Sequence, residues 1–168
     1  MVALASRMRP EDRTCPLSTT LQHVGEWWTL LILHDAFDGF TRFDEFQDNL
    51  KISSSMLTSR LKTLVADGLL ERRPYQSNPT RYEYVLTGLG WSLRPVIVSL
   101  AAWGNHRLDP AERSMILVDA ESGQEVEPVV VDRATGRRVD GAGFVFTSGP
   151  AASEAMRARY ATTRRDRS

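Results

Sequence analysis

The chain contains little that would support a disulfide-linked, membrane-spanning or uniformly basic protein. Cys15 is its one cysteine, which excludes an internal disulfide and a zinc cluster built from thiolates. No stretch approaches the roughly 18 consecutive apolar residues of a membrane span, and the first residues lack the hydrophobic segment of a secretory signal. We therefore expect a cytoplasmic protein.

Net charge and catalytic motifs are also lacking. The 21 Lys and Arg residues balance the 21 Asp and Glu residues, so any nucleic-acid binding must depend on a local patch. There is no glycine-rich phosphate loop, no nucleophile elbow and no metal-ligand set, and His23 and His34 have no Cys or Glu pair to complete one. The sequence thus predicts a protein that is not an enzyme and carries neither a cofactor nor a metal.

Residues 41–86 hold the most informative pattern in the chain. Apolar residues have helical spacing over residues 42–50, and a two-residue connection leads to a second helix that Ser53 or Ser54 can cap. Gly68 supplies the left-handed residue that ends this second helix. One face of the second helix is a stripe predicted to be buried, formed by Leu57, Leu61, Leu64 and Val65.

A predicted hairpin follows the second helix. Residues 69–75 and 81–86 have the pattern of strands around a turn at residues 76–79. Helix, short turn, helix and hairpin form the layout of a winged helix-turn-helix, whose second helix can enter the major groove of double-stranded DNA. Across residues 51–94, seven Lys and Arg face three Asp and Glu, which is the local positive excess that a phosphate-binding surface needs.

The predicted DNA contacts divide by position. Short hydroxyl side chains near the start of the second helix can reach base edges and nearby phosphates, while the cations can reach the backbone or the minor groove. Arg60 lies at the border of the buried stripe, so bracing the fold against an acidic neighbour is its alternative role. For the helix as a whole, the alternative is an ordinary solvated face. The predicted contacts are Arg42, Ser53, Ser54, Ser55, Thr58, Ser59, Arg60, Lys62, Arg72, Arg73 and Arg81.

Several short runs follow one another in a set order between Cys15 and Leu108. They are Cys15-Pro16 followed by Leu21, Val24-Gly25, Trp28-Thr29-Leu30-Leu31-Ile32-Leu33, Arg42-Phe43-Asp44-Glu45-Phe46, Leu57-Thr58, Arg60-Leu61, Asp67-Gly68-Leu69 and Tyr82-Glu83-Tyr84 before Leu86-Thr87. Over this range the chain resembles an HxlR-type regulator of the MarR-like winged-helix group. The order of several short runs carries the resemblance, since no single run is specific. Trp27 is a departure, because such proteins often have Lys or Arg at this position. The resemblance implies a dimeric transcription factor with a small-molecule or redox input.

The helices that flank the motif carry the expected dimer surface. Residues 17–24 and 26–37 are predicted helices, and residues 88–106 a long helix that Pro95 kinks or divides. The long helix has more apolar surface than one small domain needs to bury, which favours a homodimer over a helix packed wholly on its own domain. The resemblance also implies dimerisation through this helix and the Cys15 region.

Cys15 is a candidate redox sensor. It precedes Pro16 at a predicted helix start with Arg13 nearby, and a helix N-terminus and a cation both stabilise a thiolate. Several proteins that this chain resembles use a cysteine in this segment to sense oxidants or electrophiles. Because there is no second cysteine, any disulfide would be intermolecular. The alternative is a small apolar side chain packed at the dimer interface.

Beyond Asp109 the sequence changes character and contains a thirteen-residue repeat. Residues 118–123 recur as residues 131–136, each with a D-x-x-S/T-G turn whose glycine is expected in the left-handed region. We expect a small metal-free, ribbon-like antiparallel sheet, followed by a short helix at residues 151–160 and a basic tail that either touches DNA or is simply solvated. The strands predicted for this sheet are residues 115–118, 126–131 and 144–147.

The expected fold class is therefore mainly α with a small β component: a winged helix-turn-helix with dimerisation helices and a C-terminal β-hairpin appendage. The predicted function is a sequence-specific DNA-binding regulator, expected to be a repressor, that acts as a homodimer and answers a small-molecule inducer or an oxidant. A winged-helix module that binds protein and not DNA is the alternative. The expected divisions are an arm at 1–14, the winged domain at 15–108, the appendage at 109–148, and a helix with a basic tail at 149–168.

Overall fold

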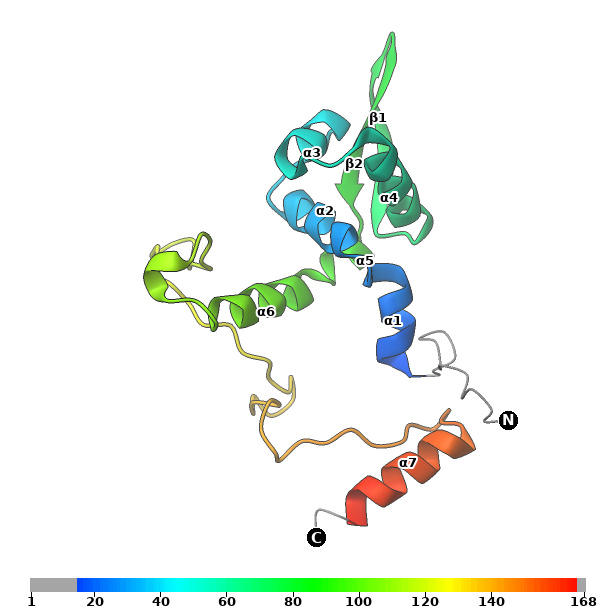
Figure 1. Ribbon diagram of the computed structural model, residues 1–168, viewed down its shortest axis with the longest axis vertical. Coiled ribbons are helices and arrows are strands. Elements are labelled where there is room, and N and C mark those ends of the chain that lie inside the picture. Colours follow the sequence, from blue (N-terminus) through cyan, green and yellow to red (C-terminus); the bar gives the residue numbers. More distant parts are fainter. Residues whose placement is uncertain (1–14, 166–168) are drawn as a thin grey trace, which may run out of the picture. The chain divides into compact units, whose positions relative to one another are not determined.

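The structure is a computed structural model that describes residues 15–165, so the expected arm at 1–14, with Arg13, lies outside the described residues, as do residues 166–168. The chain divides into two compact units, residues 1–126 and 127–168, and each is described by itself. None of the helices in the described part is both long and apolar enough to cross a membrane. The elements are α1 (Pro16–Val24), α2 (Trp27–Phe37), α3 (Phe43–Leu50), α4 (Ser54–Ala66), β1 (Leu70–Ser77), β2 (Thr80–Leu86), α5 (Gly88–Trp91), α6 (Arg94–Asn105), a 3₁₀ helix (Pro110–Glu112) and α7 (Glu154–Arg165) (Figure 1).

Helices α3 and α4 form the predicted helix-turn-helix. Lys51 ends α3 in a left-handed conformation, with φ of 52°, which turns the chain sharply toward α4. The Ser53 hydroxyl accepts a hydrogen bond from the Met56 amide and caps α4, as predicted. Gly68, with φ of 70°, ends α4, because the left-handed region favours a residue without Cβ.

The wing is a two-stranded antiparallel sheet of β1 and β2. Its register runs from Leu70 opposite Leu86 to Ser77 opposite Thr80, with an irregularity between Pro74 and Gln76. The chain entering α3 adds a short third edge, since the Tyr84 amide donates to the Thr41 carbonyl at 2.7 Å. The wing and the helix-turn-helix are therefore joined through the backbone as well as through side chains.

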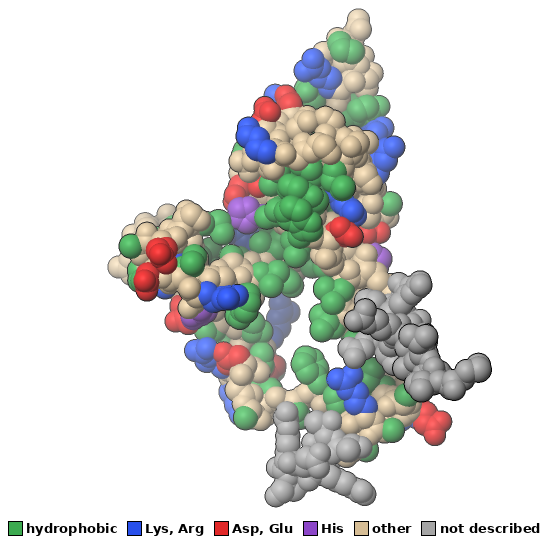
Figure 2. Space-filling model, in the orientation of Figure 1, with side chains coloured by type: hydrophobic (Ala, Val, Ile, Leu, Met, Phe, Trp, Pro, Cys, Tyr) green, Lys and Arg blue, Asp and Glu red, His purple; other side chains and the backbone are tan. Residues whose placement is uncertain are grey.

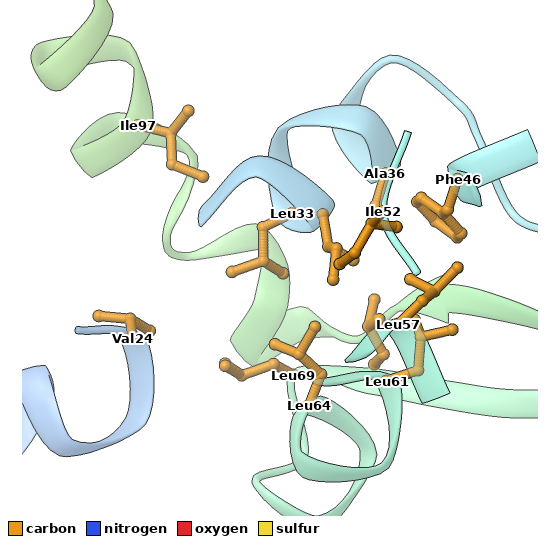
Figure 3. Close-up of a cluster of buried hydrophobic side chains, with 12 residues drawn as sticks. Val24, Leu33, Ala36, Phe46, Ile52, Leu57, Leu61, Leu64, Leu69 and Ile97 are labelled. Atoms are coloured by element: carbon orange, nitrogen blue, oxygen red, sulfur yellow. The ribbon is translucent and has the colours of Figure 1, made fainter. Parts of the chain in front are cut away.

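The core of the first unit lies where α2, α3, α4 and the base of the wing meet (Figure 3). The stripe predicted on α4 is confirmed for its three leucines, all fully buried, while Val65 is only partly buried. Truncating one such buried leucine to alanine typically costs about 2–5 kcal/mol. The buried hydrophobic residues are Val24, Ile32, Leu33, Ala36, Phe46, Ile52, Leu57, Leu61, Leu64, Leu69, Leu70 and Ile97.

The predicted helix over residues 88–106 is divided in two. Thr87 caps α5 through a hydrogen bond from the Gly90 amide, and Ser92 and Leu93 separate α5 from α6. Pro95 occupies the first turn of α6, where its missing N–H leaves no intrahelical hydrogen bond unmade. The division that proline predicted is confirmed.

The first repeat packs against the winged domain. The Asn105 side chain donates to the Met115 carbonyl at 2.9 Å, and His34 Nε2 lies 3.2 Å from Met115 Sδ. Arg113 and Glu125 form an ion pair of 3.0 Å within the same segment. Residues 109–126 thus belong to the same unit as the helices.

The predicted sheet of the appendage is wrong in extent. Both turns form as expected, with φ of 69° at Gly123 and 67° at Gly136, but each hairpin is closed by one bridge: Val118 with Glu125, and Val131 with Arg138. The three segments predicted as strands do not extend into a sheet. The physical reason is the lack of a core, because no described side chain after Ile97 is buried, and an isolated hairpin is marginal in water.

In the second unit, the predicted helix at residues 151–160 lies later in the chain. It spans Glu154–Arg165, and the Ser153 hydroxyl accepts a hydrogen bond from the Met156 amide. A serine N-cap outweighs the alanines that precede it, because those residues cannot satisfy the free amides of a helix start.

Candidate nucleic-acid interface

Helix α4 presents an exposed polar face opposite its buried leucines. The hydroxyls of Ser53 and Ser55 lie 3.3 Å apart at its start, and Thr63 donates to the Ser59 carbonyl at 3.2 Å further along. Short side chains on this face would let the α4 backbone come close to a DNA groove. The predicted α4 contacts that are exposed are Ser53, Ser54, Ser55, Thr58, Ser59 and Lys62.

Gln47 on α3 is a contact that the sequence did not reveal. Its amide Nε2 donates to the Ser54 hydroxyl over 2.6 Å, so the first helix of the motif orients the first hydroxyl of the second. A single glutamine on an amphipathic helix gives no sequence signal of this role. Only the approach of α3 to the start of α4 brings the two side chains together.

Arg60 takes the bracing position that its place beside the buried stripe suggested. Its Nη2 lies 3.2 Å from Glu26 Oε2, and its side chain is 22% exposed. Its Nε is buried and has no hydrogen-bond partner within the described residues. Most of the guanidinium is therefore turned toward α2 rather than toward the exposed face of α4.

The cations on the wing and beside it differ in what they contact. The Arg72 guanidinium lies over the Tyr82 ring at 3.9 Å, and Arg42 lies over the Tyr75 ring at 4.8 Å. Arg81 is exposed and has no ion pair within the described part of the chain. The two tyrosines were not predicted as site residues, although their place beside arginines in alternating strands could have suggested it.

Arg73 is the wing cation whose charge is most fully compensated. Its Nε and Nη2 donate to the two carboxylate oxygens of Glu71 at 3.0 and 3.1 Å. This guanidinium holds the pKa of Glu71 below its usual value, first through the hydrogen bonds and then through charge attraction. Arg73 is therefore less available to a phosphate than Arg72 or Arg81.

A carboxylate locks the junction between α3 and the wing. The amides of Thr41 and Arg42 donate to Glu45 Oε2 at 2.9 and 2.8 Å. These two backbone hydrogen bonds lower the pKa of Glu45. Because the Thr41 carbonyl accepts a hydrogen bond from the Tyr84 amide of β2, Glu45 is connected through Thr41 to the wing.

A second surface of the first unit is apolar and exposed (Figure 2). Helix α1 contributes little to the core, since among its hydrophobic residues only Val24 is buried, and His23 fastens it to Asp67 at 3.2 Å. The Trp27 ring stacks on Trp28 at 4.0 Å yet is 62% exposed. The exposed large side chains of α1, α2, α5 and α6 are Leu17, Leu21, Trp27, Leu31, Leu89, Trp91, Val96, Leu100 and Trp103.

Cys15 is the N-cap residue of α1, at the predicted helix start. Its Sγ accepts a hydrogen bond from the Ser18 amide at 3.4 Å, and the residue is partly exposed. Among the described residues, no three His, Cys, Asp or Glu side chains are grouped so that they could hold a metal ion.

Comparisons with known proteins agree with this arrangement. Residues 23–112 match the model of the HxlR-like helix-turn-helix family. The chain is 39% identical over 131 residues to the uncharacterized HTH-type transcriptional regulator Rv3095 of Mycobacterium tuberculosis, covering 77% of this chain and 83% of that one. The solved structure of PA1374 from Pseudomonas aeruginosa is 46% identical, with a TM-score of 0.64, and covers 86% of this chain and 99% of its own.

A further solved structure is that of the redox regulator HypR in its reduced form. It is 34% identical to this chain, with a TM-score of 0.53, and the match covers 58% of this chain and 98% of that one. The similarity to PA1374 spans more residues than the family model, so it continues into the repeats.

Proposed function

This chain belongs to the HxlR-like helix-turn-helix family of transcriptional regulators, which are not enzymes, and we propose that it is a homodimeric, sequence-specific repressor that acts in the cytoplasm. The observation that carries the proposal is the exposed face of α4, whose short hydroxyls and Lys62 stand beside a wing that carries Arg72 and Arg81. Helix α4 enters the major groove, and the wing lies along the phosphates or in the minor groove.

Two kinds of contact then divide the work. Thr58 and Ser59 reach base edges and set sequence preference, while Lys62 and the wing arginines neutralise phosphates and set affinity. Arg60 and Arg73 contribute less to phosphate binding, because Glu26 and Glu71 already occupy their guanidinium groups. The aromatic rings beneath Arg42 and Arg72 limit the freedom of those side chains before DNA arrives.

The homodimer is supported by the exposed apolar surface of α1 and α6. Leu17 and Leu21 on α1 are 68% and 49% exposed, and Leu100 and Trp103 on α6 are 48% and 63% exposed. Large apolar side chains that are exposed together often mark a protein interface. A twofold dimer covers this area and carries its two α4 helices to half-sites about 34 Å apart on one side of the duplex.

A footprint and a salt-dependent mobility shift on the DNA upstream of its own coding region test the proposal. We expect two protected half-sites one helical turn apart, and an affinity that falls steeply with salt. A monomer at micromolar concentration in sedimentation, or no salt-dependent shift on any upstream DNA, would reject it. The second result would favour the protein-binding alternative.

Repression follows from binding to a promoter, whereas its relief needs an oxidant, an electrophile or a small-molecule inducer. A dimer that covers a promoter blocks polymerase, and a reporter gene under that promoter should be silenced by this chain. HypR is described as a redox regulator, and this similarity supports Cys15 as the sensor of an oxidant or electrophile in the present chain. If Cys15 is only a packing residue, a small-molecule inducer that binds between the dimer helices takes its place.

A further inference from the structure

The second repeat leaves a strand edge open. Val129, Val130 and Val131 are 45%, 54% and 46% exposed, although a run of valines is typical of a paired strand. Their hairpin is held by two backbone hydrogen bonds, from the Val139 amide to the Val130 carbonyl and from the Asp132 amide to the Arg137 carbonyl. Nothing in the described chain pairs with the other side of this segment.

The direction of the backbone groups follows from those two bonds. In an extended strand the N–H and C=O groups of one residue point to the same side, and successive residues alternate. The backbone N–H and C=O groups of Val130 and Asp132 point into the hairpin, so those of Val129 and Val131 point to its open edge. Neither of these two forms a backbone hydrogen bond within the described residues. Pro128, which has no N–H, falls on the inward side and therefore does not block the edge.

We propose that this edge pairs with the same edge of a second copy of the chain, antiparallel and centred on Val130. In that register Val129 of each copy exchanges two backbone hydrogen bonds with Val131 of the other. The arrangement is self-complementary about a twofold axis, as a symmetric dimer requires. It completes across the dimer the sheet that one chain does not form by itself.

Charge complementarity selects the second copy as the partner. Side chains two residues apart lie on the same face of a strand, so the side chains of Glu127 and Arg133 flank those of Val129 and Val131 on one face. Antiparallel pairing about Val130 sets Glu127 of one copy opposite Arg133 of the other, and the symmetry makes this contact twice. The first repeat offers no such match, because Ser114 and Ala120 occupy the equivalent positions.

A disulfide across the axis tests the pairing in the full chain. Val130→Cys, made in a Cys15→Ser background, places two thiols at a non-hydrogen-bonded pair with Cα atoms about 4.5 Å apart, a separation that a disulfide spans. Oxidised glutathione then takes up the two thiol hydrogens as two reduced glutathione molecules while the interchain disulfide forms. Leu117→Cys, thirteen residues earlier in the first repeat, is the matched control. We expect Val130→Cys to cross-link at least ~10 times faster, and equal rates would overturn the pairing.

A charge reversal tests the register. Arg133→Glu, added to Val130→Cys, sets like charges opposite each other and should slow cross-linking about fivefold. Adding Glu127→Arg to that variant restores opposite charges and should restore the rate. If the reversal has no effect, or the double reversal does not restore the rate, the proposed edge is wrong.

The cross-linking experiment requires no DNA, and the same variants can be assayed by mobility shift. A chain that binds its operator but fails to cross-link overturns only this inference. A chain that cross-links but binds no DNA overturns the proposed regulatory function and leaves this pairing in place.

Discussion

Glu26 and Arg60 form an ion pair of 3.2 Å that joins the start of α2 to the side of α4 facing away from the proposed groove. The pair explains why an arginine on α4 need not be a DNA contact. It also adds a contact between α4 and the start of α2, beside the contacts that the buried leucines of α4 make with the core.

We predict that Glu26→Gln lowers the free energy of unfolding by about 0.5 kcal/mol, as for other partly exposed ion pairs. The salt dependence of DNA binding should not change, because the Arg60 side chain is largely covered and turned toward α2, so losing its partner does not bring it to the exposed face of α4. Urea unfolding and mobility shifts over a salt series measure the two quantities. Arg60→Met is the companion variant, since it keeps much of the packed stem and removes the charge. A loss of salt slope in that variant would make Arg60 a phosphate contact after all.

The hydroxyls of α4 should govern sequence preference. Thr58→Ala or Ser59→Ala removes a group placed for base edges, and each should change discrimination at one base pair by about 1–3 kcal/mol. Selection from randomised operators would show which position relaxes. Ser99→Ala on α6 is the control, because its hydroxyl is exposed and donates only to the Pro95 carbonyl. An unaltered preference in both α4 variants would contradict the assignment.

The wing should contribute affinity without preference. Arg72→Ala and Arg81→Ala should each weaken binding to all sequences alike and reduce the salt slope by about 0.9 per phosphate contact, which is about 1.8 for the two wings of a dimer. Arg73→Ala should do less, because Glu71 already compensates its charge. Glu71→Gln should therefore tighten binding by freeing Arg73. Arg138→Ala is the control for the loss of one positive charge, because Arg138 lies outside the wing and is paired with Asp140. Normal binding of the wing variants at raised salt would refute this role.

Glu45 should make stability depend on pH. Its folded pKa lies below the unfolded value, so its contribution is present above the unfolded pKa of about 4.3 and is lost as pH falls through the folded pKa. Glu45→Ala should cost about 1 kcal/mol at pH 7, with a smaller difference from the wild type in acid. Glu45→Gln keeps an acceptor without the charge and should lie between the two. A penalty that stays constant from pH 7 to pH 3 would argue against the carboxylate as its source.

Two substitutions distinguish the helix-capping role of Cys15 from its proposed thiol chemistry. Cys15→Ser keeps an acceptor for the Ser18 amide, so α1 should stay capped while thiol chemistry is lost, whereas Cys15→Ala loses both. Under diamide we expect operator binding by the wild type to change reversibly and binding by either variant not to respond. An identical response of wild type and Cys15→Ser would leave Cys15 as a capping and packing residue only.

Local rules were sufficient for the helix-turn-helix and the hairpin turns. Ser53 and Gly68 mark the ends of α4 because capping and left-handed geometry depend on a few adjacent residues. The alternating residues of the wing, the division of the long helix near Pro95, and the glycine turns of both repeats follow for the same reason. The sequence by itself therefore determined the order of elements in the winged domain and the face of α4 that is buried.

Contacts between distant residues were decided by the tertiary structure. No spacing rule brings Gln47 to Ser54, Arg60 to Glu26, or Thr41 to Tyr84, because each pair depends on how packed elements approach one another. The same reason explains the failed sheet prediction. Valines predict a strand, but a strand needs a partner and a core, and the described chain after Ile97 buries no side chain. Propensity is a property of the segment, whereas pairing and burial are properties of the whole assembly.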